Sequence, residues 1–499
     1  MYISSIAHLC VTRIGSLFVR PRRFSEEMDP LMSSPHTRSR DFVNGEVSFW
    51  MRGLDIGERR PALPGDLETD VVILGAGLTG LWTAYYLKRS RPDLDIAIVE
   101  RGFAGFGASG RIGGWMSAEP AGQFRRYAKS GGVEAARALQ QEMFGAVRES
   151  VEVARREGFD EDLVHDGLIH VATNAAQLSR AQHHVRDMRL QGWGEDDVFE
   201  LAPHELEERV RVEGARGGYW TPHCARVHPA KYTRGLARAV ESLGVRIYES
   251  TTALETGPHR VRTDRGVVAA RFVVEALEGY TLSLAGKARR LLPMNSSMVI
   301  TEPLGEDRLS RIRWSGGELV GDVAHSFTYM HRTADGRIAI GGRGVPYNFR
   351  SGFDREGRTA ESAVGALQHR LVELFPSLAG VSIEHSWSGV LGVPRDWCAS
   401  VNFDRATGIL SAGGYVGHGL SGTNLAARTL RDLILEEDTE LVRLPWVGRR
   451  ARNWEFEPIR WIGATARYAA YRHADRREYA TDQSRTHWMA RAANLVSGR

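Results

Sequence analysis

Three glycines and one acid between residues 75 and 100 have the types and spacing of a phosphate-binding turn. Gly75, Gly77 and Gly80 follow the pattern GxGxxG, and Glu100 lies 20 residues after Gly80. The first glycine permits a tight turn, the second lets the backbone approach a pyrophosphate, and the third lets a helix pack on a strand. An acid at that distance accepts the ribose hydroxyls of an adenosine. The spacing therefore predicts a dinucleotide-binding site.

The flanking sequence supplies the elements that would position this turn. Asp70–Leu74 is a short apolar run rich in β-branched residues, which predicts a buried parallel strand. A helix is predicted over Leu81–Leu87, and a second strand, Asp95–Val99, leads to the acid. Leu78 and Thr79 then stand at the helix N-terminus, whose free N–H groups attract phosphate. This order makes a purely structural turn the weaker interpretation. The acid also disfavours a 2′-phosphate, so FAD or NAD is expected rather than NADP.

The segment after the acid favours FAD. Residues 101–115 are too rich in glycine for an ordinary crossover, and such bare backbone suits a flat, bulky ligand. The motif at Gly107–Gly114 resembles that of the FAD-dependent amine and amino-acid oxidoreductases of the D-amino-acid-oxidase-like (DAO) family, in particular the branch containing γ-glutamylputrescine oxidase. The candidate cofactor-binding residues here are Arg101, Ser109, Gly110, Arg111, Gly113 and Gly114.

A second glycine-rich turn occurs late in the chain. A predicted last core strand, Ile409–Ala412, is followed by a glycine-rich turn and by a helix predicted over Thr423–Leu435. An NAD dehydrogenase would not need this turn, whereas a helix N-terminus beside a flavin favours its reduced, anionic form by about 0.3–2 kcal/mol. The candidates are Gly414, Gly417, His418 and Gly419. The resemblance further implies that the backbone of Ala253 touches adenine, while Leu277 and Glu278 depart from the family's pattern.

The predicted fold class is α/β: a Rossmann-type FAD-binding domain of the glutathione-reductase kind with an α+β substrate domain that contains a mixed or antiparallel sheet. The FAD-binding domain is expected to be discontinuous, over residues 46–135, 222–290 and 385–440. The substrate domain takes residues 136–221 and 291–384. Residues 1–45 are expected to form a poorly ordered arm, and residues 441–499 a helical tail packed on the body.

Composition sets limits on the class of protein. Charged residues are 25% and the net charge is 65 − 61 = +4, which does not by itself imply a nucleic-acid partner. No apolar run approaches the roughly 18 residues of a membrane span. Cys10, Cys224 and Cys398 are scattered, which fits a reducing cytosol, so a cytoplasmic location is expected. No metal site is expected, because His183 and His184 fit a solvated helix face.

Two segments bear on the substrate. Asp335-Gly336 predicts a hairpin turn, and related enzymes use this sheet to line the substrate pocket, so Tyr329 and Arg332 are the pocket candidates. Family members that bind amino acids often carry arginine at the end of a Trp-x-Gly-x-Arg strand, where this chain has Leu391. Without that arginine an α-carboxylate would be buried unpaired. An amine or N-substituted compound is therefore expected, although Arg332 or Arg343 could replace the missing arginine.

The resemblance implies oxidation of a C–N bond by hydride transfer to flavin N5, giving an imine that hydrolyses. FAD is expected to be non-covalent, because the Gly107–Gly114 loop offers neither Cys nor His. One alternative is a flavin-dependent amino-acid oxidase or dehydrogenase. Another is a flavin-bearing RNA-modifying or RNA-binding protein that uses the basic, aromatic tail. A small-molecule amine is the expected partner, with no nucleic acid and no membrane span. The electron acceptor, oxygen or another compound, stays open.

Overall fold

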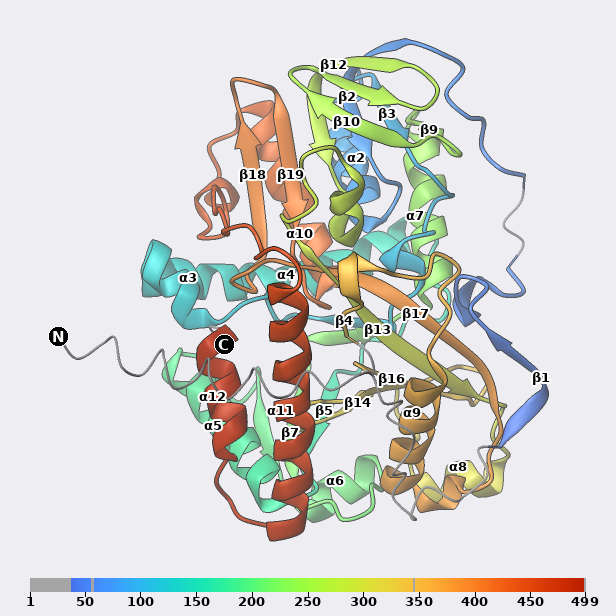
Figure 1. The fold of residues 1–499 in the computed structure, drawn as a ribbon, viewed down its shortest axis with the longest axis vertical. Coiled ribbons are helices and arrows are strands. Elements are labelled where there is room, and N and C mark those ends of the chain that lie inside the picture. The colour runs from blue at the N-terminus through green and yellow to red at the C-terminus, as the bar shows by residue number, and fades with distance from the viewer. Residues whose placement is uncertain (1–36, 55–57, 344–345, 498–499) are drawn as a thin grey trace, which may run out of the picture. The chain divides into compact units, whose positions relative to one another are not determined.

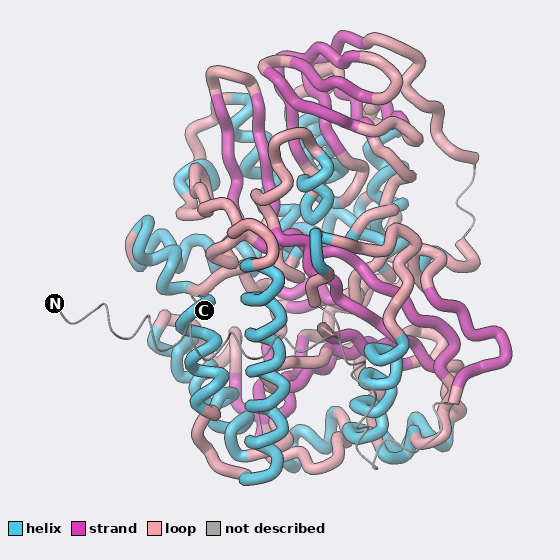
Figure 2. The backbone as a smooth tube through the Cα atoms, in the orientation of Figure 1, coloured by secondary structure: helices cyan, strands magenta, loops and turns pink. Residues whose placement is uncertain are grey.

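In the computed structural model of this chain, residues 37–54, 58–343 and 346–497 are described (Figure 1). Within residues 38–497 two large sheets organise the chain, and Figure 2 shows their strands in magenta with helices packed around them. Predictions that fall on residues 1–36 lie outside the described residues.

The first sheet carries the predicted phosphate-binding turn. Its path is β10-β11-β12-β2-β3-β9, with β19 paired to β12 and β18 paired to β19. β2, β3, β9, β12 and β19 run parallel to their neighbours in this group. The strands are β2 (Leu67–Leu74), β3 (Ile96–Val99), β9 (Arg246–Tyr248), β10 (Ala253–Gly257), β11 (Arg260–Thr263), β12 (Val267–Glu275), β18 (Ser400–Asp404) and β19 (Ile409–Gly413).

Helices bury one face of this parallel sheet. α2 (Leu78–Ser90), α4 (Val133–Arg156), α7 (Pro229–Ser242) and α10 (Gly419–Leu435) share one apolar core with its strands. Every residue of β3 is buried, as expected for a parallel strand covered on both faces. The Rossmann-type half of the predicted fold class is confirmed.

The second sheet has nine strands among the described residues, in the order β1-β17-β13-β16-β15-β14-β5-β7-β6. Most pairs are antiparallel, but β1 with β17 and β5 with β14 are parallel. The predicted mixed sheet is thus confirmed. The strands are β1 (Arg38–Asn44), β5 (Leu168–Val171), β6 (Phe199–Leu201), β7 (Gly218–Thr221), β13 (Leu292–Thr301), β14 (Leu319–Asp322), β15 (Tyr329–Arg332), β16 (Ile338–Gly342) and β17 (Ile383–Val393). β15 and β16 form the hairpin predicted at Asp335-Gly336.

Two sequence-based boundaries differ from the structure. Arg38–Asn44 was expected in a poorly ordered arm, but its backbone pairs with β17 as an edge strand. Residues 385–393 were assigned to the FAD-binding domain, yet they belong to β17, which pairs with β13 along ten residues. An edge strand of polar residues needs only backbone pairing on one side, so it leaves little hydrophobic signal in the sequence.

The remaining elements link the sheets. β4 (Trp115–Ser117) pairs with β8 (Cys224–Arg226). The other helices are α3 (Phe124–Gly131), α5 (Ala175–Leu190), α6 (Pro203–Arg209), α8 (Glu306–Ile312) and α9 (Glu361–Leu374), and the chain closes with α11 (Ile459–Thr481) and α12 (Trp488–Ser497), drawn in red in Figure 1. Among the described helices none is both long and apolar enough to cross a membrane.

Candidate active site

A cleft at the carboxyl ends of β2, β3, β12 and β19 brings together segments from four parts of the chain. This is where ligands bind in open parallel sheets. Ten of the predicted cofactor-binding residues line it: Gly75, Gly77, Leu78, Thr79, Glu100, Arg101, Ser109, Ala253, Gly417 and Gly419. The early and late glycine turns therefore face one space.

The turn after β2 is shaped by backbone packing. Gly75 has φ +100°, and a Cβ there would lie 2.9 Å from the carbonyl oxygen of Ala276. A Cβ on Gly80 would lie 2.1 Å from the carbonyl oxygen of Gly75, so Gly80 packs in the turn and does not line the cleft. Gly77 borders the cleft, where a Cβ would lie 3.0 Å from Ser109 Oγ.

Glu100 is held rigidly at the end of β3. One carboxylate oxygen accepts the N–H of Ala76 at 3.0 Å, and the other accepts the N–H of Gly102 at 2.7 Å. Burial raises the pKa of Glu100, while these two backbone hydrogen bonds lower it. The acid therefore ties β3 to the glycine turn and fixes the edge of the cleft where a ribose would bind.

The donors around the cleft fit a phosphate-bearing dinucleotide. α2 and α10 both begin at the cleft, with Gly77 and His418 as their N-cap residues. Neither N-cap side chain accepts a hydrogen bond from its helix, and neither helix has an acid in its first turn. The Leu78 N–H donates to Ser109 Oγ at 2.9 Å. Tyr280 also lines this cleft, and its buried hydroxyl has no hydrogen-bond partner among the described residues. Two helix N-termini without acids, of which α2 is only partly capped by Ser109, favour an anionic ligand such as FAD.

Glu278, which departs from the family's pattern, crosses from the end of β12 to the late glycine turn. Its carboxylate accepts the N–H groups of Gly414 at 2.7 Å and Tyr415 at 3.2 Å. Gly414 does not line the cleft, because its N–H is directed to this carboxylate and its Cβ position lies 2.5 Å from Pro394 Cγ. Burial raises the pKa of Glu278 to about 7.

This raised pKa makes a stability prediction for Glu278→Gln. The folded state holds the proton more tightly than the unfolded chain, whose carboxyl titrates near 4.5. Native stability therefore falls as pH rises from about 4.5 to about 7, by up to about 3 kcal/mol, and the amide variant lacks this loss. We expect the difference in Tm between Glu278→Gln and the native protein to become more positive as the pH is raised from about 5 to about 8. Parallel thermal unfolding profiles would contradict this, and Glu134→Gln, at an exposed site on α4, is the control.

A second cavity of about 890 Å³ adjoins the cleft. Ala108, Ile112, Leu391 and Gly417 line both spaces, so a flavin ring at this junction would face the cavity. The predicted residues that line the cavity are Arg111, Gly113, Gly417, His418 and Tyr329.

Tyr329 lies beside the Gly107–Gly114 segment, here called the flavin loop. Its hydroxyl lies 2.9 Å from Ser296 Oγ, and its ring packs on two glycines: a Cβ would come within 2.7 Å of the ring at Gly113 and within 2.3 Å at Gly341. The structure does not bring Arg332 to this place. Arg332 is absent from the described cavity lining and its guanidinium donates to the carbonyl of Trp314. Residues three apart on a strand face opposite sides of the sheet, so Tyr329 and Arg332 cannot share one pocket.

The rest of the flavin loop is fixed by Arg111 and by close backbone packing. The buried Arg111 guanidinium donates to the carbonyls of Phe106 (2.9 Å), Arg355 (2.7 Å) and Ser388 (3.3 Å). Gly110 and Gly114 line neither space, because their Cβ positions lie 2.3 Å and 2.4 Å from backbone carbonyl oxygens. In this structure Arg111 therefore anchors the loop to β17.

His418 stands at the start of α10 and faces the cavity. Its Nδ1 lies 3.3 Å from Ser117 Oγ and 3.8 Å from a carboxylate oxygen of Glu119. Glu119 was not found from the sequence, and neither were Trp115, His170 and Tyr219, which also line the cavity. Trp115 and Glu119 lie on β4 and in the loop after it, while His170 lies on β5 and Tyr219 on β7, so no single sequence pattern joins all four.

The expectation that His184 belongs to a solvated helix face is wrong. His184 lines the cavity and stacks on Tyr219 with ring centroids 4.6 Å apart, whereas the neighbouring His183 is exposed. α5 packs one face on the sheet, and His184 falls on that face.

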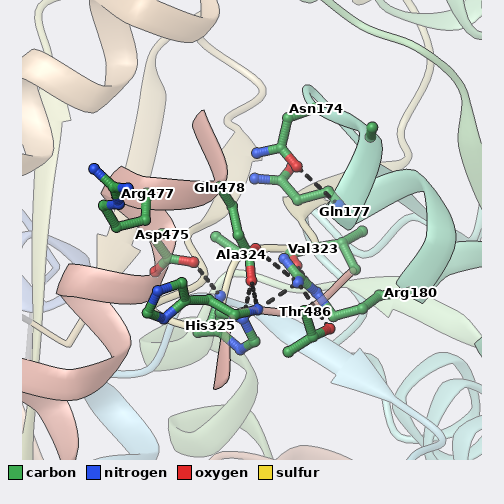
Figure 3. Close-up of polar contacts among 12 residues, drawn as sticks. Asn174, Gln177, Arg180, Val323, Ala324, His325, Asp475, Arg477, Glu478 and Thr486 are labelled. Atoms are coloured by element: carbon green, nitrogen blue, oxygen red, sulfur yellow. Dashed lines mark hydrogen bonds and ion pairs between the residues drawn. The ribbon is translucent and has the colours of Figure 1, made fainter. Parts of the chain in front are cut away.

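Figure 3 shows a polar cluster in which Arg180 and His325, which line the cavity, meet Asp475 and Glu478 of α11. His325, Asp475 and Glu478 place possible metal-ligating atoms within 4.8 Å of one another. However, Arg180 Nη1 lies 2.8 Å from Glu478 Oε2 and 3.2 Å from His325 Nε2, and Asp475 accepts the N–H groups of His325 and Ser326. Because the Arg180 guanidinium already lies beside these groups, the cluster fits an ion-pair contact between α5 and α11 rather than a cation site.

Comparisons with known proteins agree with this geometry. A family model described as "DAO: FAD dependent oxidoreductase" matches residues 70–433. Gamma-glutamylputrescine oxidoreductase of Escherichia coli (strain K12) is 31% identical over 379 residues, covering 74% of this chain and 84% of the relative. The probable oxidoreductase OrdL of Rhizobium meliloti (strain 1021) is 29% identical over 400 residues, covering 76% of this chain and 86% of the relative.

A solved structure, glycine oxidase from Geobacillus kaustophilus, has the same fold. It superposes with a TM-score of 0.62 at 24% identity, covering 77% of this chain and 100% of that chain. The family indicated by the motif at Gly107–Gly114 is confirmed. The chain therefore belongs to the DAO family of FAD-dependent oxidoreductases, and FAD is its cofactor.

Proposed function

We propose that this protein oxidises the C–N bond of an amine that lacks an α-carboxylate. The observation that carries the proposal is the position of Leu391, which lines both the FAD cleft and the adjoining cavity. Trp387, Gly389 and Leu391 alternate on one face of β17, and that face meets the flavin loop: Trp387 Nε1 donates to the carbonyl of Arg111 at 2.7 Å. Leu391 thus puts an apolar side chain at the strand position where amino-acid-binding members of the family often carry arginine, which supports a substrate without an α-carboxylate.

In this reaction the protein's main task would be to position the flavin and the substrate and to exclude water. FAD, when bound, supplies the two-electron oxidation. The chain would hold the flavin between α2 and α10 and present one ring face to the cavity. Leu391 and Ile112 make the junction apolar, and a poorly solvated site disfavours the ammonium form, so an amine would arrive there neutral. The imine product then hydrolyses in water.

A flavin-dependent amino-acid oxidase is the second candidate, and Arg343 is the observation that favours it. Arg343 lines the same cavity, where its guanidinium donates to Tyr468 Oη at 2.7 Å and to the carbonyl of Val416 at 3.2 Å. A carboxylate that reached Arg343 would compete with these two acceptors.

A substrate panel separates the two candidates. Flavin reduction without oxygen, followed by absorbance, is measured with primary amines, N-substituted amines and simple α-amino acids. We expect amines to give the larger kcat/KM, because a carboxylate beside Leu391 would be buried unpaired at a cost of several kcal/mol. Fastest reduction by α-amino acids would overturn the proposal in favour of the second candidate.

A further inference from the structure

Five aromatic rings form a continuous row along the cavity wall. The order is Tyr329, Trp115, His170, Tyr219 and His184, and all five line the cavity. Successive ring centroids are 5.7, 6.1, 4.7 and 4.6 Å apart. The row begins beside the flavin loop, where Tyr329 packs on Gly113, and ends on α5.

The row is held in place by the backbone around it. The Trp115 ring packs on Gly321, where a Cβ would lie 2.8 Å from the ring, and its indole N–H donates to the carbonyl of Met330 at 3.1 Å. Tyr219 is stacked between His170 and His184 with interplanar angles of 24° and 27°. Rings fixed in this way present a preformed wall to a ligand.

Two carboxylates stand beside this wall. Glu119 and Asp187 both line the cavity, and their side chains are 46% and 51% exposed, so each can meet a ligand. The negative charge of Glu119 acts to raise the pKa of His170, His184 and Tyr219, and that of Asp187 acts to raise the pKa of His184. Burial lowers the pKa of His170 and of His184, so both rings are neutral at pH 7 and do not repel a cation.

Three of the four arginines that line the cavity among the described residues are held by buried acceptors, while Arg125 is exposed and makes one side-chain hydrogen bond. Arg111 and Arg343 have the partners given above, and Arg180 is paired with the buried Glu478. Arg125 Nε donates to Gln123 Oε1 at 2.6 Å. An anionic ligand would therefore compete with protein acceptors for Arg111, Arg180 and Arg343. A cationic ligand would meet the aromatic row and two half-exposed carboxylates, Glu119 near His418 and Asp187 near His183.

We propose that the aromatic row together with Glu119 and Asp187 forms a subsite for a second ammonium group of the substrate. The preferred substrate would then be a linear diamine or polyamine, with one amine at the flavin end near Tyr329 and another cation farther along the row, within reach of Glu119 or Asp187. Cations bind aromatic faces and carboxylates favourably when partly desolvated. The inference rests on the proposed amine oxidation and names its substrate class.

The test compares two amines that differ only in the second ammonium, 1,6-diaminohexane and hexylamine. We expect the native enzyme to have the lower KM for the diamine. Asp187→Asn should raise the diamine KM by about fivefold, leave kcat little changed, and leave hexylamine unaffected. Glu119 lies next to His418 of the flavin site, so for Glu119→Gln the measured quantity is the ratio of the two KM values, which should shift toward hexylamine. Glu195→Gln is the matched control, because Glu195 is 90% exposed and lies outside the described cavity lining. Equal KM values for the two amines in the native enzyme, or amide variants that change both amines alike, would overturn the subsite.

A binding measurement separates the subsite from the proposed function. Hexamethonium and hexyltrimethylammonium have no nitrogen lone pair to support oxidation, so calorimetric titration of the FAD-loaded protein reports binding alone. Tighter binding of the double cation, weakened by Asp187→Asn, supports the subsite even if no amine reduces the flavin, in which case the proposed function alone fails. Equal binding of the two cations refutes the subsite. The titration of the native protein and of Asp187→Asn also tests the subsite if Glu119→Gln does not retain flavin.

Discussion

Gly77→Val is expected to yield colourless protein, while the native protein is yellow. Gly77 borders the cleft at the start of α2, and a side chain there would stand where the pyrophosphate meets the helix N-terminus and would press on Ser109 Oγ, 3.0 Å from the Cβ position. Both the close approach and the N–H groups would be lost to the ligand. The measurement is the flavin absorbance per protein after purification and after denaturation. Full flavin content in the variant would show that this turn does not bind FAD.

Gly305→Val is a matched control for this variant. Gly305 is also an N-cap glycine with extended backbone, it precedes α8, and no atom lies within 4 Å of its Cβ position. It should keep its colour, with a small loss of Tm because valine is a poorer N-cap than glycine. In the native protein, acid precipitation should leave the yellow colour in the supernatant, because FAD is expected to be non-covalent. Colour in the pellet would contradict that expectation.

Leu391→Arg is expected to shift specificity from amines toward amino acids. The side chain lies at the junction of the FAD cleft and the cavity, so a guanidinium there would meet a substrate carboxylate in a paired, charge-assisted geometry and would repel a cationic amine. The ratio of kcat/KM for amines to that for α-amino acids should fall by roughly a hundredfold if the junction is well desolvated. Flavin reduction with both substrate classes measures it.

Leu391→Met provides the control, since it keeps the volume and adds no charge. It should retain the native preference. A Leu391→Arg variant that behaves like the native protein with both substrate classes, while still binding FAD, would place residue 391 outside the substrate's reach and remove the main support for the proposed function.

The parts of the site that could be predicted from the sequence are those written as local patterns. Gly75, Gly77, Gly80 and Glu100 lie on one strand-turn-helix-strand unit, and its order alone fixes where each side chain points. The late turn was predicted for the same reason, because a strand, a glycine turn and a helix follow one another directly. In such units the local sequence alone is enough to predict the geometry.

The cavity could not be predicted in this way. Its wall takes Trp115 from β4, His170 from β5, His184 from α5 and Tyr219 from β7, and only the pairing of β5 with β7 and the packing of α5 bring them together. Pairing between distant strands leaves no local signature. Even within one hairpin, the prediction of Tyr329 and Arg332 in one pocket ignored the alternation of side chains along a strand.

β12 joins parts of the chain that are synthesised far apart in time. β2, which begins at Leu67, and β19, which ends at Gly413, both pair with β12. On the ribosome the turn at Gly77 therefore emerges long before the turn at Gly417 that completes the cleft. Until β19 arrives, the growing sheet keeps an open edge, which is a risk for aggregation. The cleft for the flavin is therefore complete only after residues 415–423 have emerged.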